Sequence, residues 1–278
     1  MHSTSSALRP RLLLAASALA SVALFWTSWR QLVSLSLDDR RYSHLILIPL
    51  ISAFFLYRER RAIFSRVALS PRLGLPFLAA ALLLWFVHHL SAAILAAVLV
   101  LVAGFAVAYG AHALKAARFP LLFLLLLVPI PFDVMDRIIA VLQRGSAEAT
   151  YALFKLTGVP VFRDGVRFEL PGIGLEIAKE CSSIHSAWAL FITGLLLAHM
   201  FLKSLWTKTG LTVITIPIAM LTNAVRIATL WFLGTHVDIG FLFGNLHRNG
   251  GILFSLISLS ILIVFLYLLR KLEHPLPA

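Results

Sequence analysis

Three residues of this chain have side chains suited to acyl transfer: Cys181, which is the only cysteine, Arg226 and His247. A cysteine thiolate is a strong nucleophile, and the thiol pKa falls at a helix N-terminus or beside a cation. A histidine accepts the thiol proton and later donates it to a leaving amine. An arginine keeps its charge at physiological pH, so it can hold an oxyanion or orient a carbonyl group. Together the three side chains suit acyl transfer through a thioester.

Each of these residues also has a structural interpretation, which the sequence leaves open. Cys181 can be a small packing residue at a helix end, and His247 can be an interfacial histidine. Arg226 can extend to the membrane boundary, although a charge inside a membrane helix costs several kcal/mol and usually marks a functional site. His185 lies one helical turn after Cys181, so it is either a second base or a polar residue of the same cleft. Asn223, one turn before Arg226, suits a hydrogen bond between helices.

The composition indicates a membrane protein. Of the 278 residues, 60% are hydrophobic, whereas soluble domains contain about 45–50%. The net charge of +12 would favour nucleic acid in a soluble protein, but the basic loops of a membrane protein explain it, so no nucleic-acid partner is expected. One cysteine cannot form an internal disulfide. No nucleotide-binding glycine loop, CxxC pair or HExxH motif occurs, so we expect no nucleotide, zinc or other cofactor.

Eight apolar segments are predicted to cross the membrane as helices. They lie near residues 11–29, 43–57, 75–90, 92–110, 119–132, 181–202, 209–232 and 250–269. The second, third and fifth segments are short, and Pro129 and Pro131 are expected to kink or end the fifth. The first segment follows Arg9 and Arg11 and resembles a signal peptide. Its apolar run continues through Trp29, which favours an uncleaved anchor helix.

The predicted orientation follows from the Lys and Arg residues, which concentrate in short cytoplasmic loops of membrane proteins. If the N-terminus is cytoplasmic, most basic residues of the short loops lie inside, and so does the C-terminus. Cys181 then opens the sixth segment at its outer end. Arg226 lies in the outer half of the seventh segment, and His247 lies at the outer mouth of the eighth. The topology thus brings three residues that are distant in the sequence to the outer face.

The segment between the fifth and sixth crossings, residues 133–180, is extracytoplasmic in this topology. Its first part, residues 133–158, predicts an amphipathic helix on the outer leaflet, because apolar residues recur at helical spacing. These apolar residues are Val134, Ile138, Val141 and Leu142. The next residues alternate between apolar and polar types around Asp164-Gly165, which predicts a small β-hairpin. The predicted fold class is therefore an all-α polytopic membrane protein with about eight transmembrane helices and this extracytoplasmic helix and hairpin.

Several motifs of the chain resemble those of the exosortases and archaeosortases, which are membrane-embedded cysteine transpeptidases. The stretch "ECSSIHS" at 180–186 is similar to their cysteine motif, and "LTNAVRI" at 221–227 is similar to their arginine motif. "HRNGG" at 247–251 is similar to their His-x-x-x-Gly motif. Two further segments, "YSHLILIPLISAFFLYRER" at 42–60 and "VPIPF" at 128–132, also resemble family segments. The likeness extends over most of the chain, with the motifs in the order that the family has.

The resemblance implies a Cys-Arg-His catalytic triad formed by Cys181, Arg226 and His247. It implies a single integral membrane domain over residues 1–278, in which residues 133–180 are an insert before the catalytic helix. The implied substrates are exported proteins with a C-terminal tail that consists of a motif such as Pro-Glu-Pro, a membrane helix and a basic cluster. The enzyme would act at the outer face of the bacterial cytoplasmic membrane. It would pass the acyl group to a surface acceptor such as a polysaccharide or a lipid amine, in keeping with the family's frequent place beside exopolysaccharide genes.

Two positions depart from the family motifs. Ser183-Ile184-His185 stands where Gly-Ile-Arg is usual after the cysteine, so a titratable side chain replaces a permanent cation. Leu45 stands where glycine follows Tyr-Ser-His. These differences suggest a divergent subfamily with its own sorting signal.

Two other function classes are alternatives on the residues alone. A transporter or flippase would use Arg226 and the histidines along a substrate path, and it would need polar residues at mid-membrane in several helices. A non-catalytic subunit of an exopolysaccharide assembly system would tolerate the replacement of Cys181. The polar residues found in the predicted crossings are mainly Arg226 and Asn223, near the outer end of one segment, which favours the enzyme.

Overall fold

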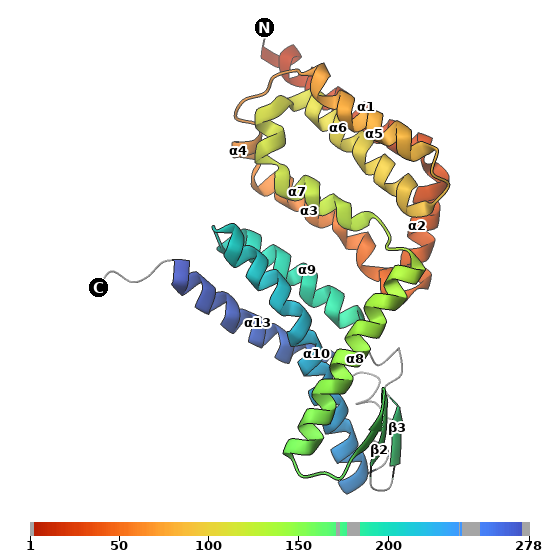
Figure 1. The fold of residues 1–278 in the computed structure, drawn as a ribbon. Helices are drawn as coiled ribbons and strands as arrows, with labels where there is room; N and C mark the ends of the chain where they lie inside the picture. The colour runs from red at the N-terminus through yellow and green to blue at the C-terminus, as the bar shows by residue number, and fades with distance from the viewer. Residues whose placement is uncertain (1–2, 171–172, 177–183, 239, 241–250, 274–278) are drawn as a thin grey trace, which may run out of the picture. The chain divides into compact units, whose positions relative to one another are not determined.

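The computed structural model describes residues 3–170, 173–176, 184–238, 240 and 251–273 (Figure 1). The chain divides into two compact units, Met1–Pro131 and Phe132–Ala278. Helices make up most of both units, and a small antiparallel sheet belongs to the second. The predicted fold class, a mainly helical membrane protein with a small extramembrane sheet, is therefore confirmed.

The first unit is a bundle of helices in which α6 contacts both α1 and α5. Its elements are α1 (Ser3–Leu24), α2 (Trp26–Asp38), the 3-10 helix η1 (Arg40–Ile46), α3 (Leu47–Arg58), α4 (Arg60–Ile63), α5 (Pro71–Trp85), α6 (Leu90–Ala116), α7 (Arg118–Phe123) and the 3-10 helix η2 (Leu124–Leu127). The buried Ser21 hydroxyl donates to the Ala97 carbonyl oxygen at 2.9 Å, which joins α1 to α6.

The first predicted crossing, residues 11–29, is not a straight helix. α1 ends at Leu24, and α2 begins at Trp26 at an angle of 78° to it. Phe25 between them has non-helical dihedral angles (φ −112°, ψ 27°). Its ring is 5% exposed and packs edge-to-face on Trp85 of α5 at 5.1 Å between ring centroids. The bend places Phe25 in the core, a tertiary contact that an apolar run does not indicate.

Two segments with family-like motifs are tied together in the first unit. The hydroxyl of Tyr42, a residue 1% exposed, donates to the Ile130 carbonyl oxygen at 2.7 Å. The Ser91 hydroxyl donates to the Pro129 carbonyl oxygen at 2.6 Å. The helical structure before these prolines ends at Leu127, so the predicted interruption of the fifth apolar segment by a kink or an end is confirmed. Carbonyl groups of the non-helical segment then serve as acceptors for the neighbouring elements.

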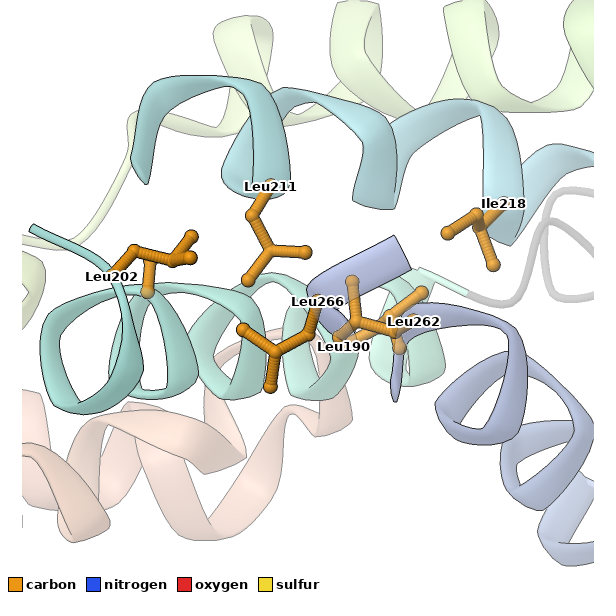
Figure 2. Close-up of a cluster of buried hydrophobic side chains, with 7 residues drawn as sticks. Leu190, Leu202, Leu211, Ile218, Leu262 and Leu266 are labelled. Atoms are coloured by element: carbon orange, nitrogen blue, oxygen red, sulfur yellow. The ribbon is translucent and has the colours of Figure 1, made fainter. Parts of the chain in front are cut away.

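The second unit contains a bundle of three helices, a long helix and a sheet (Figure 1). The elements among its described residues are α8 (Phe132–Leu156), β1 (Phe162–Asp164), β2 (Arg167–Leu170), β3 (Ile173–Glu176), α9 (Ile184–Phe201), α10 (Leu205–His236) and α13 (Gly251–Glu273). Figure 2 shows the hydrophobic core between α9, α10 and α13. This bundle core consists of Leu190, Ala198, Leu202, Leu211, Ile218, Leu262 and Leu266. Gly194 allows α9 and α10 to approach closely, since a Cβ there would lie 2.7 Å from Thr215 Cγ2.

The sheet has the strand order β1-β2-β3, and both pairs are antiparallel. Asp164 pairs with Arg167 across a two-residue turn that begins at Gly165, whose φ is 60°. Glycine adopts this left-handed conformation without strain, which suits a tight hairpin turn. The hairpin predicted around Asp164-Gly165 is confirmed, while the third strand was not predicted.

The predicted amphipathic helix is confirmed as α8, and its predicted apolar residues are divided between a packed and an exposed face. Leu142 is buried, as are Met135 and Ile139, whereas Val134 and Val141 are 45% and 52% exposed. Gly145 allows α8 to approach α10 closely, because a Cβ there would clash with the Met220 side chain of α10. Small residues of α8 therefore face α10, and hydropathy alone does not identify such a face.

Within the described residues, four helices are long and apolar enough to cross a membrane: α6, α9, α10 and the Ile252–Glu273 part of α13. The number is six if α1 with α2, and α7 and η2 with α8, each form one broken crossing. The predicted count of about eight crossings is not confirmed. α3, which forms the second predicted crossing, has 12 residues. At about 1.5 Å per residue it is roughly 18 Å long, less than the roughly 30 Å of a bilayer's hydrocarbon core.

Candidate active site

A cluster of polar side chains lies where the first turns of α9 and α13 meet the middle of α10. This polar cluster consists of Ser186, Thr222, Asn223, Arg226, Ser255 and Ser258. The Ser255 hydroxyl donates to the Ser186 hydroxyl oxygen at 3.2 Å. The buried Ser258 hydroxyl donates to the Thr222 hydroxyl oxygen at 2.8 Å. These two hydrogen bonds join α13 to α9 and α13 to α10, so they fix the three helices against one another at this end.

Arg226 and Asn223 share one face of α10, because residues three apart in a helix are neighbours. Asn223 is 3% exposed, and Arg226 is partly buried. With Ser186 and Ser255 they line a cavity of about 20 Å³, which is enough for about one water molecule. A peptide does not fit into this cavity.

Two predicted site residues, Cys181 and His247, lie outside the described residues. Cys181 precedes the first residue of α9 by three positions, and His247 precedes that of α13 by four. His185 lies in the first turn of α9, next to Ser186 of the polar cluster, and is exposed. Arg226, Asn223 and His185 therefore lie at the same end of the bundle. Among the described residues, no group of His, Cys, Asp or Glu side chains is arranged to hold a metal ion.

The opposite end of the bundle is closed by Glu273, near the end of α13. Its carboxylate accepts hydrogen bonds from the backbone N–H groups of Lys203 and Ser204, at 2.9 and 2.7 Å. A carboxylate at the N-terminus of a helix is stabilised by unpaired backbone donors and by the helix dipole. The basic residues near this end are Lys203, Lys208, Arg270 and Lys271. The polar cluster and the basic residues thus lie at opposite ends of the bundle.

α10 continues beyond the polar cluster and ends at His236. The part after Arg226 adds roughly 15 Å to the helix. It packs on α8 and the sheet through a hydrophobic core that includes Ile227, Trp231, Phe154 and Phe168. The Phe154 and Trp231 rings meet edge-to-face at 5.1 Å between centroids. We call this part of the second unit, formed by the end of α10, the second half of α8 and the sheet, the cap.

An ion pair joins the sheet to α8 within the cap. The Arg163 guanidinium of β1 donates from Nη2 to Glu148 Oε1 at 2.9 Å, and its Nη1 lies 2.8 Å from Oε2. The Arg163 Nε–H donates to the Gly165 carbonyl oxygen at 2.6 Å, so the guanidinium also holds the hairpin turn. The hydrogen bond to Glu148 raises the pKa of Arg163 above its ordinary value. The cap is therefore held by polar contacts as well as by its hydrophobic core.

The fold and this site define a polytopic helical membrane protein with a polar cluster and a partly buried arginine at one end of a helix bundle, next to a small cap. The family model described as transmembrane exosortase (Exosortase_EpsH) matches residues 26–264. The chain therefore belongs to the transmembrane exosortase family, and the resemblance seen in its motifs is confirmed. Membership supports a role as a membrane-embedded sorting transpeptidase. No curated protein and no solved structure matches the chain significantly.

The sequence motifs did not identify Thr222, Ser255 and Ser258 as parts of the site. Their spacing carries a signal, because Ser255 and Ser258 are three residues apart and Thr222 is four residues before Arg226. Each pair therefore lies on one helix face. Hydroxyl groups on one face of an apolar helix often bond across to a neighbouring helix, although many bond only to their own backbone.

Replacing Ser258 by alanine is expected to lower the unfolding temperature of the purified protein by a few degrees. The change removes the hydrogen bond between α13 and α10, and such bonds contribute about 0.6–1 kcal/mol in membrane proteins. Thr222 keeps its own bond to the Ile218 carbonyl oxygen at 2.7 Å, so no buried donor is left without an acceptor. Ser260→Ala is the matched control, because exposed Ser260 bonds only to the Leu256 carbonyl oxygen at 2.9 Å among the described residues. Equal unfolding temperatures for the two variants would contradict the proposed contribution.

Proposed function

We propose that the chain is a membrane cysteine protease and transpeptidase that cleaves the C-terminal sorting tail of exported proteins. Membership of the exosortase family supports the general activity. The observation that carries the residue-level proposal is the meeting of α9, α10 and α13 at Arg226, because Cys181 and His247 directly precede two of these helices. Cys181, Arg226 and His247 are the proposed catalytic residues.

Covalent geometry supports this assignment. An extended chain spans at most about 3.5 Å per residue, so Cys181 lies within about 11 Å of Ile184, and His247 within about 14 Å of Gly251. The helices that begin at Ile184 and Gly251 are joined near their starts by the hydrogen bond between Ser186 and Ser255. Both proposed catalytic residues therefore belong to segments that directly precede two helices joined at the polar cluster.

In the proposed reaction the same three residues act in both halves, the formation of the thioester and its release. His247 accepts the proton of the Cys181 thiol, and the thiolate attacks the carbonyl carbon of the scissile peptide bond. The Arg226 guanidinium stabilises the negative oxygen of the tetrahedral intermediate. His247 then donates its proton to the leaving amine, and a thioester remains on Cys181. An acceptor amine, or water, gives a proton to His247 and attacks the thioester carbon. The carbon–sulfur bond then breaks, and the leaving Cys181 thiolate takes the proton from His247.

The positions of the charges support an active site at the outer face of the bacterial cytoplasmic membrane with both termini inside. The basic residues Lys203, Lys208, Arg270 and Lys271 lie at the end of the bundle opposite the polar cluster. Basic residues favour the cytoplasmic side, so the polar cluster belongs to the outer side. The cap then lies outside the membrane, where exported proteins present their tails.

An apolar groove beside the site suits the membrane helix of such a tail. The groove has a volume of about 440 Å³ and lies between α8, α9 and α10. Val134 and Ile138 line it from α8, Trp188 from α9 and Ile216 from α10. Ala187 lines both this groove and the polar cluster. A helix bound in the groove would therefore have one of its residues next to the region of Arg226.

The interior of the bundle favours an enzyme over a transporter. Leu190 lines the polar cluster and is also part of the hydrophobic bundle core, together with Ile218 and Leu262 (Figure 2). This core closes the bundle directly below the polar cluster. A transport path through these three helices would have to displace it.

The proposed function is tested by the thioester that it requires. The full-length protein is mixed with a synthetic tail that contains Pro-Glu-Pro, an apolar helix and a basic cluster, and the reaction is stopped in acid. Mass spectrometry is expected to find the Cys181 peptide heavier by the acyl part of the tail, and hydroxylamine is expected to release this adduct. The Cys181→Ala variant should form neither adduct nor cleaved tail. Cleavage by Cys181→Ala would contradict the proposal, and the mass of the final product distinguishes hydrolysis from transfer to an amine.

A further inference from the structure

The first unit contains a pocket of about 640 Å³ between α1, the end of α3, α4 and the second half of α6. Arg11 and Arg60 line it, together with the aromatic rings of Tyr57, Phe105 and Tyr109. Its volume lies within the range of about 300–1,000 Å³ that is common for ligand sites. The pocket lies within one unit of the chain, and it does not involve the polar cluster.

The lining of this pocket changes from charged to apolar along the helix axes. Leu14, which also lines it, lies one turn further along α1 than Arg11. Phe105 lies one turn before Tyr109 in α6, and the two rings are 5.0 Å apart between centroids. Phe105 is 2% exposed and Tyr109 8% exposed, so they form the floor of the pocket. The pocket therefore suits an amphiphile, with a polar end near the arginines and an apolar end against Leu14 and Phe105.

Both arginines have hydrogen-bond donors available for a ligand. Arg60 donates from Nη1 to the Tyr57 carbonyl oxygen at 2.8 Å, and its guanidinium carbon lies 4.1 Å from the centre of the Tyr57 ring. These contacts orient Arg60 and use one of its five N–H donors. Arg11 forms no hydrogen bond or ion pair with any residue that the structure describes. The pocket lining contains two guanidinium groups and no carboxylate, so its charge favours an anion.

We propose that this pocket binds an anionic phospholipid, with the phosphate held by Arg11 and Arg60 and an acyl chain against Leu14 and Phe105. Guanidinium groups pair with phosphate oxygens through two parallel hydrogen bonds. Both arginines belong to the basic side of the predicted topology, which is the leaflet where anionic lipids attract basic residues. Arginines whose only role is to keep a loop on the cytoplasmic side would not require an apolar pocket beside them. The apolar lining next to Arg11 and Arg60 therefore favours a lipid site over a simple basic surface.

The test is native mass spectrometry of the full-length protein with phosphatidylglycerol or phosphatidylcholine of identical acyl chains. The wild type is expected to retain phosphatidylglycerol at least tenfold more tightly. The double variant Arg11→Gln/Arg60→Gln should lose this preference, with an affinity about thirtyfold lower, since each basic residue contributes about 1 kcal/mol near an anionic lipid surface. Arg66→Gln/Arg72→Gln removes the same charge from two exposed arginines outside the pocket lining, and its affinity should stay within twofold of wild type.

A second variant tests the apolar half of the pocket. Leu14→Trp keeps both arginines but fills the space beside them, so it should weaken phosphatidylglycerol binding while the unfolding temperature stays within a few degrees. If the two double variants lose equal affinity for phosphatidylglycerol, the preference is a general effect of charge and the proposed site is wrong. Two results would show that the pocket binds a free anion and not a lipid. One is displacement of bound lipid by an equal concentration of inorganic phosphate, and the other is undiminished phosphatidylglycerol binding by Leu14→Trp.

Discussion

Replacing Arg226 by lysine is expected to lower the rate of tail processing by about 100-fold or more, although the positive charge is kept. A guanidinium offers a planar set of donors that matches two acceptor atoms at once, whereas an ammonium group acts as a compact charge. Loss of one donor to an oxyanion costs about 10²–10³ in rate. The polar cluster fixes the helix that carries Arg226, so a shorter, differently shaped side chain is not compensated by a movement of the backbone. Single-turnover cleavage of the synthetic tail, followed by mass spectrometry, measures the effect.

Stability measurements separate this catalytic role from a structural one. Arg226→Gln should abolish most activity while the unfolding temperature changes by no more than a few degrees, because the side chain is only partly buried and glutamine retains hydrogen-bond donors. Arg144→Gln is the matched control, since Arg144 is an exposed arginine of α8 outside the polar cluster. An Arg226→Lys variant with full activity would show that only a charge near the membrane boundary is needed. An activity loss that follows unfolding would assign Arg226 a structural role.

The helices could be predicted from the sequence because their apolar runs are long, but their ends and bends depend on tertiary contacts. α10 runs from Leu205 to His236, further at both ends than the predicted crossing at 209–232. Its final part is helical because Trp231 packs on Phe154 and Phe168 in the cap. This packing involves residues some 60–80 positions earlier in the sequence, so no local pattern indicates it. The break at Phe25 has the same origin, in a contact with Trp85.

Only part of the candidate site could be predicted from the sequence, because some of its contacts depend on how the helices pack. A charge within an apolar segment is conspicuous, so Arg226 and its neighbour Asn223 were identified from the sequence. The hydroxyl residues Thr222, Ser255 and Ser258 were not, because a serine or threonine in a membrane helix can bond to its own backbone instead. Ser258 bonds both to the Phe254 carbonyl oxygen and to Thr222. The bond to Thr222 forms only because the packing of the bundle core turns the Ser258 side of α13 toward α10.

Replacing His247 by alanine is expected to reduce tail processing by about 10²–10⁴, the usual contribution of a general acid and base. In the proposed mechanism no other group takes the thiol proton, so the variant should also form the Cys181 thioester slowly. Added imidazole is expected to restore part of the rate, because a small base can enter the space that the side chain leaves. The pH dependence of the wild-type rate should show a rising limb near the histidine pKa that is absent from His247→Ala.

The same experiment with His185 decides which histidine is the base. His185 lies in the first turn of α9, exposed and next to Ser186, at the end of the bundle that also holds Arg226. His185→Ala should keep the rate within about threefold, and so should His185→Arg, which restores the residue that the cysteine motif of the family usually has. If His185→Ala loses the rising limb and His247→Ala keeps it, the two roles are exchanged. His185→Arg would then be inactive, because a guanidinium cannot accept a proton from the thiol.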